Sequence, residues 1–395
     1  MKNIKQKMQI LEGSNAISEV IKNIGVDVVS AYPITPQTHI VEDLAKAKAD
    51  GESDFEYLKA ESEFAAASIV LGAAAAGART YSATSSQGLL LMTEVLFNAS
   101  GMRLPLVMTC ANRAISAPIN IWNDQQDVMT IRDSGWILLF AENHQEAVDQ
   151  HIMAYKLAEE LKIPVMVNVD GFVITHSYEP VYIPEAKLIK KYLPKYKAAA
   201  GDYLDVKNPM TLGSLVTPSD YMEIREELHE DINAAAKTIN KEFSLYNKII
   251  NGEEKNTPNN NGLFEYCGPK NPNLILIAMG SVIGTIKEVV NNSKDKNKIG
   301  ILKIKSYRPF PGNEISEIIK KLKAKNIAIL EKAISLGASG PLAADLKAAL
   351  FGKYNGGAKN YIIGLGGRDI KQGTIKTIIK DAQNPKSKND TKFIK

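Results

Sequence analysis

Short apolar runs alternate with helical periodicity over roughly the first 169 residues, and this alternation is what most constrains the fold. Apolar or β-branched runs at 26–30, 55–58, 80–84 and 106–110 read as strands. The stretches between and after them, at 40–49, 64–76, 89–100 and 145–161, have helical periodicity. Strands that alternate with helices form parallel sheets covered on both faces. The sequence therefore predicts an α/β fold built on a parallel sheet.

Polar residues stand just past the end of each predicted strand. Thr35 follows the run 26–30, Glu63 follows 55–58, Ser85-Ser86-Gln87-Gly88 follows 80–84, and Arg113 follows 106–110. In an open parallel sheet the carboxyl ends of the strands meet at one edge, and ligands bind there. We therefore expect these residues to form one site.

Each of these residues also has a purely structural interpretation. Thr35, fixed between Pro33 and Pro36, is either a rigid hydrogen-bond donor or a helix cap. Glu63 is either a proton-accepting carboxylate or an acid that complements a helix dipole. Arg113 suits an anionic ligand, or else an ion pair with one of the nearby acids, Asp124 or Asp127.

Charge and composition exclude several classes of protein. The net charge of +4, from 48 basic and 44 acidic residues, predicts no nucleic-acid or membrane surface. No apolar run reaches the ~18 residues that a membrane helix needs, and the first residues lead into no secretory signal, so we expect a cytoplasmic protein. Cys110 and Cys267 alone provide neither a disulfide framework nor the ligands of a zinc or four-cysteine iron–sulfur site, so we expect no metal on this chain.

The pattern divides the chain into four segments. The first domain spans 1–176, an extended and helical linker spans 177–262, a second α/β domain spans 263–385, and a polar tail spans 386–395. In the second domain the strands are predicted at 274–278, 300–304, 327–330 and 361–363. Its helices are predicted at 283–290, 314–322 and 342–351.

Several motifs, taken together and in order, resemble a known family. They are Ala31-Tyr32-Pro33-Ile34-Thr35-Pro36, Glu61-Ser62-Glu63, Thr84-Ser85-Ser86-Gln87-Gly88-Leu89, Asn112-Arg113-Ala114-Ile115-Ser116-Ala117-Pro118, Arg132-Asp133-Ser134-Gly135-Trp136, Asp170-Gly171-Phe172, Tyr307-Arg308-Pro309-Phe310-Pro311 and Gly364-Leu365-Gly366-Gly367-Arg368-Asp369. The chain is similar over nearly its whole length to the alpha subunits of multi-subunit pyruvate:ferredoxin oxidoreductases (pyruvate synthases), which belong to the 2-oxoacid:ferredoxin oxidoreductase family.

The resemblance implies a fold and a reaction. The fold is a thiamine-diphosphate-binding domain of the pyrimidine type followed by a transketolase C-terminal-like domain. The reaction converts pyruvate, coenzyme A and oxidised ferredoxin reversibly to acetyl-CoA, carbon dioxide and reduced ferredoxin. The same chemistry on another 2-oxoacid, such as a branched-chain acid or oxalate, is the alternative.

The resemblance also implies roles for individual residues. Glu63 is the catalytic acid that faces a ring nitrogen of the cofactor's aminopyrimidine and favours its imino tautomer. Thr35 and Arg113 hold the carboxylate of the substrate. The remaining contacts to thiamine diphosphate are assigned to Pro33, Ile34, Ser86 and Gln87.

What the sequence lacks implies partners. In this family a Gly-Asp-Gly motif holds Mg²⁺ and the diphosphate, and this chain has no such motif. The resemblance therefore implies a cofactor shared with a beta subunit. It places Mg²⁺ and the [4Fe–4S] clusters on beta, gamma and delta partners, and leaves the chain inactive alone.

Two segments depart from the family pattern. Glu331-Lys332 stands where an Asp-Arg pair is expected, and Gln125-Gln126-Asp127 where a His is common.

Two other classes of function are alternatives. The glycine-rich stretch 361–368 could begin a dinucleotide-binding turn, although little chain follows it, and the alanine-rich helices could belong to a non-catalytic scaffold.

Overall fold

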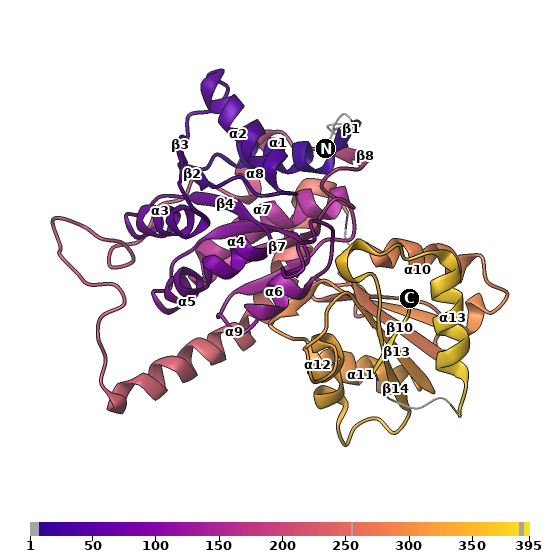
Figure 1. Ribbon diagram of the computed structural model, residues 1–395. Helices are drawn as coiled ribbons and strands as arrows, with labels where there is room; N and C mark the ends of the chain where they lie inside the picture. Colours follow the sequence, from indigo (N-terminus) through magenta and orange to yellow (C-terminus); the bar gives the residue numbers. More distant parts are fainter. Residues whose placement is uncertain (1–7, 254–255, 387–390) are drawn as a thin grey trace.

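The computed structural model describes residues 8–253, 256–386 and 391–395, and Figure 1 shows its two α/β domains in contact with each other. Residues 1–7 of the predicted first domain, 254–255 of the predicted linker and 387–390 of the predicted tail lie outside the described residues. Within the described part, no helix combines the length and the apolarity needed to cross a membrane.

A seven-stranded sheet forms the centre of the first domain, in the order β12-β6-β7-β5-β4-β2-β3. Its strands are β2 (Val28–Ala31), β3 (Glu56–Lys59), β4 (Thr80–Thr84), β5 (Val107–Asn112), β6 (Ile137–Phe140), β7 (Val165–Asp170) and β12 (Ser306–Arg308). All neighbours run parallel except β12, which is antiparallel to β6. Every residue of β4, β5, β6 and β7 is buried. The predicted parallel sheet is therefore confirmed.

Two layers of helices cover this sheet. The first layer is α1 (Gly13–Ile24), α2 (Thr38–Ala49) and α7 (His144–Leu161), in which α1 packs against both other helices. The second layer is α3 (Glu63–Ala75), α4 (Ser86–Leu91), α5 (Thr93–Gly101) and α6 (Gln126–Thr130). Right-handed crossovers that run in opposite directions along the sheet place these layers on opposite faces.

The order of the strands creates a switch point at the carboxyl edge of this sheet, and the ligand crevice of an open α/β sheet lies at such a point. β2 lies between β3 and β4, so the connections that follow β2 and β4 leave in opposite directions. Such a switch point is where open α/β sheets bind ligands. The loops that carry Thr35 and Ser86 flank it.

The second domain has a six-stranded sheet in the order β15-β14-β13-β10-β11-β9. Its strands are β9 (Phe264–Cys267), β10 (Leu274–Met279), β11 (Ile299–Ile304), β13 (Asn326–Glu331), β14 (Gly357–Ile362) and β15 (Thr391–Phe393). Only β9 is antiparallel. The helices are α10 (Val282–Asn291), α11 (Gly312–Leu322), α12 (Pro341–Leu350) and α13 (Gln372–Gln383), with α10 packed on α13 and α11 on α12. Short 3₁₀ turns lie at Lys296–Lys298 and Leu365–Gly367.

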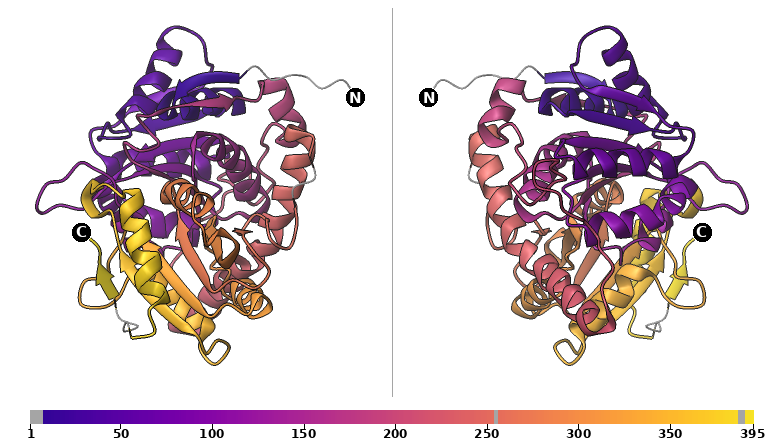
Figure 2. Two further views of the ribbon diagram at one scale, coloured as in Figure 1. Left: turned by 90° about the vertical axis from the view of Figure 1, so that its right-hand side faces the viewer. Right: turned by 90° about the vertical axis from the view of Figure 1, so that its left-hand side faces the viewer.

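The intervening segment packs along the first domain. β8 (Tyr178–Tyr182) pairs antiparallel with β1 (Met8–Glu12), and α8 (Ala186–Tyr192) follows. Helix α9 (Pro218–Tyr246) contacts α7 and ends in a π-helical turn, Asn247–Asn251. Figure 2 shows α9, in the salmon part of the chain, running along one flank of the molecule.

Two short strands differ from the sequence prediction. β12 follows β11 after a single residue, yet it joins the sheet of the first domain, so the predicted boundary at 262 does not separate the two sheets. The predicted polar tail contributes β15, because the main chain of Thr391–Phe393 pairs with the free edge of β14. Main-chain pairing of this kind needs no apolar run, so neither strand had a signal in the sequence.

Candidate active site

The loop after β2 is held in place by hydrogen bonds before any ligand binds. Pro33 is exposed, and Ile34 and Thr35 are half-buried. The side-chain amide of Gln37 donates to the carbonyl of Ala83 in β4 at 3.0 Å, and the Gln37 main-chain N–H donates to the carbonyl of Ile34 at 2.9 Å. Helix α2 has Gln37 at its N-cap, so Thr35 is not the cap. The Thr35 hydroxyl has no hydrogen-bond partner among the described residues.

Glu63 is the first residue of α3 and is only 8% exposed. Ser62 caps this helix, because its hydroxyl accepts the N–H of Ala65 at 3.1 Å. Across the described chain the Glu63 carboxylate has neither a hydrogen bond nor an ion pair. The carboxylate oxygens are therefore free to accept hydrogen bonds from a ligand. Glu63 therefore has the properties of a ligand-facing group.

Gly88 in α4 leaves room for the Glu63 side chain. A Cβ atom on Gly88 would lie 2.7 Å from Glu63 Oε1 and 2.6 Å from Thr84 Oγ1. Any larger residue would displace the acid. The Thr84 hydroxyl is itself buried without a partner, so this corner of the crevice holds two unpaired polar groups.

Ser86 and Gln87 open α4 beside this corner. The Ser86 main-chain N–H donates to Asp127 Oδ2 at 3.0 Å, and its hydroxyl lies 2.6 Å from Gln87 Oε1. The Gln87 Nε2 atom is buried and has no partner. Gln87 therefore offers a donor to a ligand, whereas Ser86 fixes the turn.

Arg113 follows β5 and is 9% exposed. Its Nη1 donates to the Thr35 carbonyl at 2.8 Å and its Nε donates to the Asn120 carbonyl at 3.1 Å. Within the described residues the guanidinium forms no ion pair, so the alternative of a salt bridge to Asp124 or Asp127 is wrong. Nη2 has no partner there, which leaves this side of the guanidinium available to an anion. Burial lowers the pKa of Arg113 from its ordinary value.

Asp127 connects the loop after β4 to the loop after β5. From the sequence it was expected only as an ion-pair partner of Arg113. Its Oδ2 accepts the main-chain N–H groups of Ser86 and Arg113, each at 3.0 Å. Its Oδ1 accepts from the Asn112 amide at 3.0 Å. Complete burial raises its pKa to about 6, and the hydrogen bonds oppose that rise. A contact to main-chain groups far away along the chain leaves no pattern in the sequence, so it was not predicted.

The structure thus brings most of the predicted site residues to one edge. Thr35 and Arg113 are joined by a direct hydrogen bond, and Asp127 links Arg113 to Ser86. Glu63 lies across α4 from that link, against Gly88.

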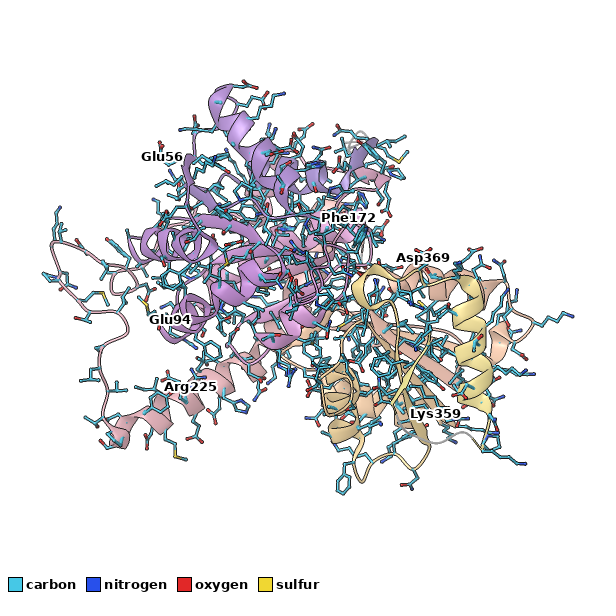
Figure 3. All side chains as sticks on the ribbon, viewed as in Figure 1. Glu56, Glu94, Phe172, Arg225, Lys359 and Asp369 are labelled. Atoms are coloured by element: carbon cyan, nitrogen blue, oxygen red, sulfur yellow. The ribbon has the colours of Figure 1, made fainter. Side chains whose placement is uncertain are left out.

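A buried ion pair closes the site on the side of the second domain. Lys332 Nζ lies 2.8 Å from Asp170 Oδ2 and 2.9 Å from Asn123 Oδ1. Asp170 also accepts from the main-chain N–H of Ser281 at 2.8 Å and from the Gln125 amide at 3.0 Å. Of the two residues that depart from the Asp-Arg pattern, Lys332 therefore forms a domain contact, whereas Glu331 accepts hydrogen bonds from Leu342 and Asn360 within the second domain. In Figure 3 the labelled residues Phe172 and Asp369 mark the two sides of this junction.

The glycine-rich turn after β14 packs on the first domain. Gly366 donates its N–H to Asp124 Oδ2 at 3.2 Å, and its carbonyl accepts from the Asn120 amide at 3.1 Å. A Cβ atom on Gly367 would lie 2.3 Å from Trp122 Cβ. These contacts use the turn as a domain interface, which leaves the dinucleotide alternative without support.

The polar groups at this edge fit the aminopyrimidine end of thiamine diphosphate. They are an acid without a partner, an unpaired threonine hydroxyl and an unpaired amide donor, at Glu63, Thr84 and Gln87. A flat ring with donors and acceptors on its edge satisfies such a set.

Comparison with known proteins agrees with this geometry. Residues 19–244 match the family model described as pyruvate flavodoxin/ferredoxin oxidoreductase, thiamine diphosphate-binding, and residues 273–375 match pyruvate:ferredoxin oxidoreductase core domain II. The solved 2-oxoglutarate:ferredoxin oxidoreductase from Magnetococcus marinus superposes with a TM-score of 0.70 at 19% identity, over 96% of this chain and 66% of that one.

Relatives of similar length extend the match. Pyruvate synthase subunit PorA of Methanocaldococcus jannaschii is 48% identical over 94% of each chain, and that of Pyrococcus furiosus is 42% identical over 92% of this chain and 90% of its own. Ketoisovalerate oxidoreductase subunit VorA of Pyrococcus abyssi is 39% identical over 94% of this chain and 93% of its own. The chain therefore belongs to the pyruvate flavodoxin/ferredoxin oxidoreductase family.

Proposed function

We propose that this chain is the alpha subunit of a cytoplasmic, thiamine-diphosphate-dependent pyruvate:ferredoxin oxidoreductase. The enzyme converts pyruvate, coenzyme A and oxidised ferredoxin reversibly to acetyl-CoA, carbon dioxide and reduced ferredoxin. One observation carries the proposal: Glu63, which has no partner among the described residues, opens the helix after β3, and the linked pair Thr35 and Arg113 follows β2 and β5 at the same carboxyl edge of the sheet.

The residues of this chain have distinct roles in that reaction. Thiamine diphosphate, when bound, supplies the carbon that attacks the 2-oxoacid and the electron sink for loss of carbon dioxide. Glu63 holds a proton at the aminopyrimidine ring nitrogen, and Gln87, Ile34 and Pro33 border that ring. The Ser86 turn keeps Gln87 in place through its contact with Asp127.

The pair Thr35 and Arg113 orients the substrate. A 2-oxoacid carboxylate accepts hydrogen bonds from Arg113 Nη2 and from the Thr35 hydroxyl, neither of which has another partner in the described chain. Because the loop of Thr35 is already fixed by Gln37, little conformational entropy is lost on binding.

The site is half of an active site. Cys110 is buried and Cys267 lies alone on β9, so this chain does not supply the four ligands of an iron–sulfur cluster. We assign Mg²⁺ and the diphosphate to a beta subunit, and the [4Fe–4S] clusters to beta, gamma and delta partners that pass electrons to ferredoxin.

The experiment is a substrate panel on the complex copurified with its partners. We expect ferredoxin reduction, assayed with and without coenzyme A because oxalate leaves no acyl group to transfer, to show a higher kcat/KM for pyruvate than for 2-oxoisovalerate or oxalate. We expect the isolated chain to be colourless and inactive. The relative that acts on ketoisovalerate makes the branched-chain acid the second candidate. A preference for either other acid would overturn the substrate assignment, and iron–sulfur absorption in the lone chain would overturn the division between subunits.

A further inference from the structure

Two histidines and a glutamate lie together outside the active-site crevice. Glu12, His39 and His176 each offer one ligand atom, and these three atoms lie within 4.8 Å of one another. The three side chains are partly buried. They come from the end of β1, the first turn of α2, and the connection between β7 and β8. We propose that Glu12, His39 and His176 bind a divalent transition metal of the zinc class.

The backbone holds two of these residues in fixed positions. Glu12 pairs with Tyr178 in the register of β1 and β8. The main chain of Gly13 donates to Ser177 at 3.2 Å, and that of Ser14 donates to Thr175 at 3.0 Å, so two hydrogen bonds bracket His176. The ligands therefore need little ordering to bind an ion.

The orientation of the imidazoles suits a metal. The Thr175 hydroxyl lies 2.7 Å from His176 Nδ1 and forms a hydrogen bond with that nitrogen. Nε2 is therefore the nitrogen of His176 that is left to bind a metal. The Phe172 ring packs 4.7 Å from the His176 ring.

The distances require only small side-chain shifts. A tetrahedral zinc ion with bonds of about 2.0–2.1 Å holds its ligand atoms about 3.3 Å apart. His39 Nδ1 lies 2.7 Å from Glu12 Oε1, and the rings of His39 and His176 lie 4.7 Å apart. The His39 side chain is 44% exposed, so it can rotate and a fourth position stays open to water.

The chemistry of the donors selects the metal. Two imidazoles and one carboxylate are typical zinc ligands, whereas Mg²⁺ and Ca²⁺ require mostly oxygen. The other acidic group, Glu142, Glu146 and Glu265, does not compete as a metal site. Its centre is taken by Lys303 Nζ, which lies 2.7 Å from Glu142 and 2.9 Å from Glu265.

The test titrates the tag-free, chelator-treated full chain with Zn²⁺ against a chromophoric chelator, and with Co²⁺ by visible absorption. All variants are made in the Cys267→Ser chain, which lacks the thiol on β9 and serves as the parent. The site variants are Glu12→Gln, His39→Gln and His176→Gln. The control is His229→Gln, which changes an exposed histidine of α9.

We expect one equivalent of Zn²⁺ in the parent and the control, a Co²⁺ spectrum typical of tetrahedral nitrogen and oxygen ligation, and at least tenfold weaker binding in each site variant, on the order of 10–100-fold. Zn²⁺ should raise Tm in the parent and the control only. Circular dichroism checks that the variants fold. Less than one equivalent, or equal affinity in the site variants, would show that Glu12 and His39 form only an ion pair.

Discussion

The carboxyl edge of the first sheet and the junction between the two domains are both polar and largely buried, but they differ in whether their charged side chains form ion pairs. At the edge, Glu63 and the Thr35 hydroxyl have no partner in the described chain, and Thr84 and Gln87 each contain an unpaired buried atom. At the junction, Asp170 is neutralised by Lys332 and accepts further hydrogen bonds.

This difference separates the residues that can bind a ligand from those that hold the two domains together. Folding pairs buried polar groups wherever it can, because an unpaired one costs about 1–3 kcal/mol. The paired charges of Asp170 and Lys332 therefore hold the domains together, although Gln125 Oε1 beside them is unpaired, whereas the unpaired groups at the edge are available to a ligand. Mutations in the two regions should affect different measurements.

The largest effect should come from Glu63→Gln in the assembled complex. We expect turnover to fall by about 10²–10⁴-fold, the usual contribution of a positioned acid or base, while the complex still assembles. The measurement is steady-state ferredoxin reduction. Exposed Glu61 provides the matched control, and Glu61→Gln should leave activity unchanged. The reverse pattern would show that the wrong acid has been assigned.

At the junction, Lys332→Met should act on stability. It leaves the buried Asp170 charge unpaired, which costs about 3–5 kcal/mol. Chemical denaturation of the full chain measures this loss. The control is Lys298→Met, which removes an exposed pair with Asp295 and should cost about 0–1 kcal/mol. Equal losses in the two variants would refute the assembly role.

Asp127 predicts a pH dependence. Because burial raises its pKa to about 6, protonation below that pH removes the negative charge of Asp127 and weakens its hydrogen bonds from Ser86 and Arg113. We expect kcat/KM for pyruvate to fall about tenfold per pH unit below pH 6, and Asp127→Asn to be less active with no such limb.

The contribution of Asp127 to the free energy of unfolding should change with pH in the opposite direction to activity. A carboxyl group whose pKa in the folded chain lies above its ordinary value of about 4 stabilises the fold at low pH, and this contribution is lost as the pH rises from about 4 to 6. Acidification itself therefore does not unfold the chain through Asp127. Unfolding that coincides with the loss of activity below pH 6 would therefore contradict this explanation.

The sequence predicted the edge well because strand ends are marked by local patterns. The strands β2 to β5 and the residues Thr35, Glu63 and Arg113 follow from apolar runs and the polar residues after them. Asp127 was expected only as an alternative ion-pair partner of Arg113, and the Asp170–Lys332 pair was not predicted, since these contacts join groups 14 to 162 residues apart. β12 and β15, with three residues each, are too short for any periodicity.

The smallest effects belong to the proposed substrate clamp, and they test the central claim that the unpaired edge serves the 2-oxoacid. Arg113→Lys cannot offer parallel donors and should lower kcat/KM for pyruvate by about 1–3 kcal/mol, and Thr35→Val should act less strongly. Affinity for thiamine diphosphate should hardly change in either variant.

The most direct measurement is the double-mutant cycle of these two changes, read in kcat/KM for pyruvate and, separately, in the free energy of unfolding. Two residues that grip one carboxylate should be non-additive by about 0.5–3 kcal/mol in kcat/KM. The unfolding cycle controls for the hydrogen bond from Arg113 to the Thr35 carbonyl, which Thr35→Val leaves in place. We predict coupling in kcat/KM that exceeds any in unfolding. Additive losses in kcat/KM, or coupling of equal size in unfolding, would contradict the clamp and leave Arg113 a structural residue.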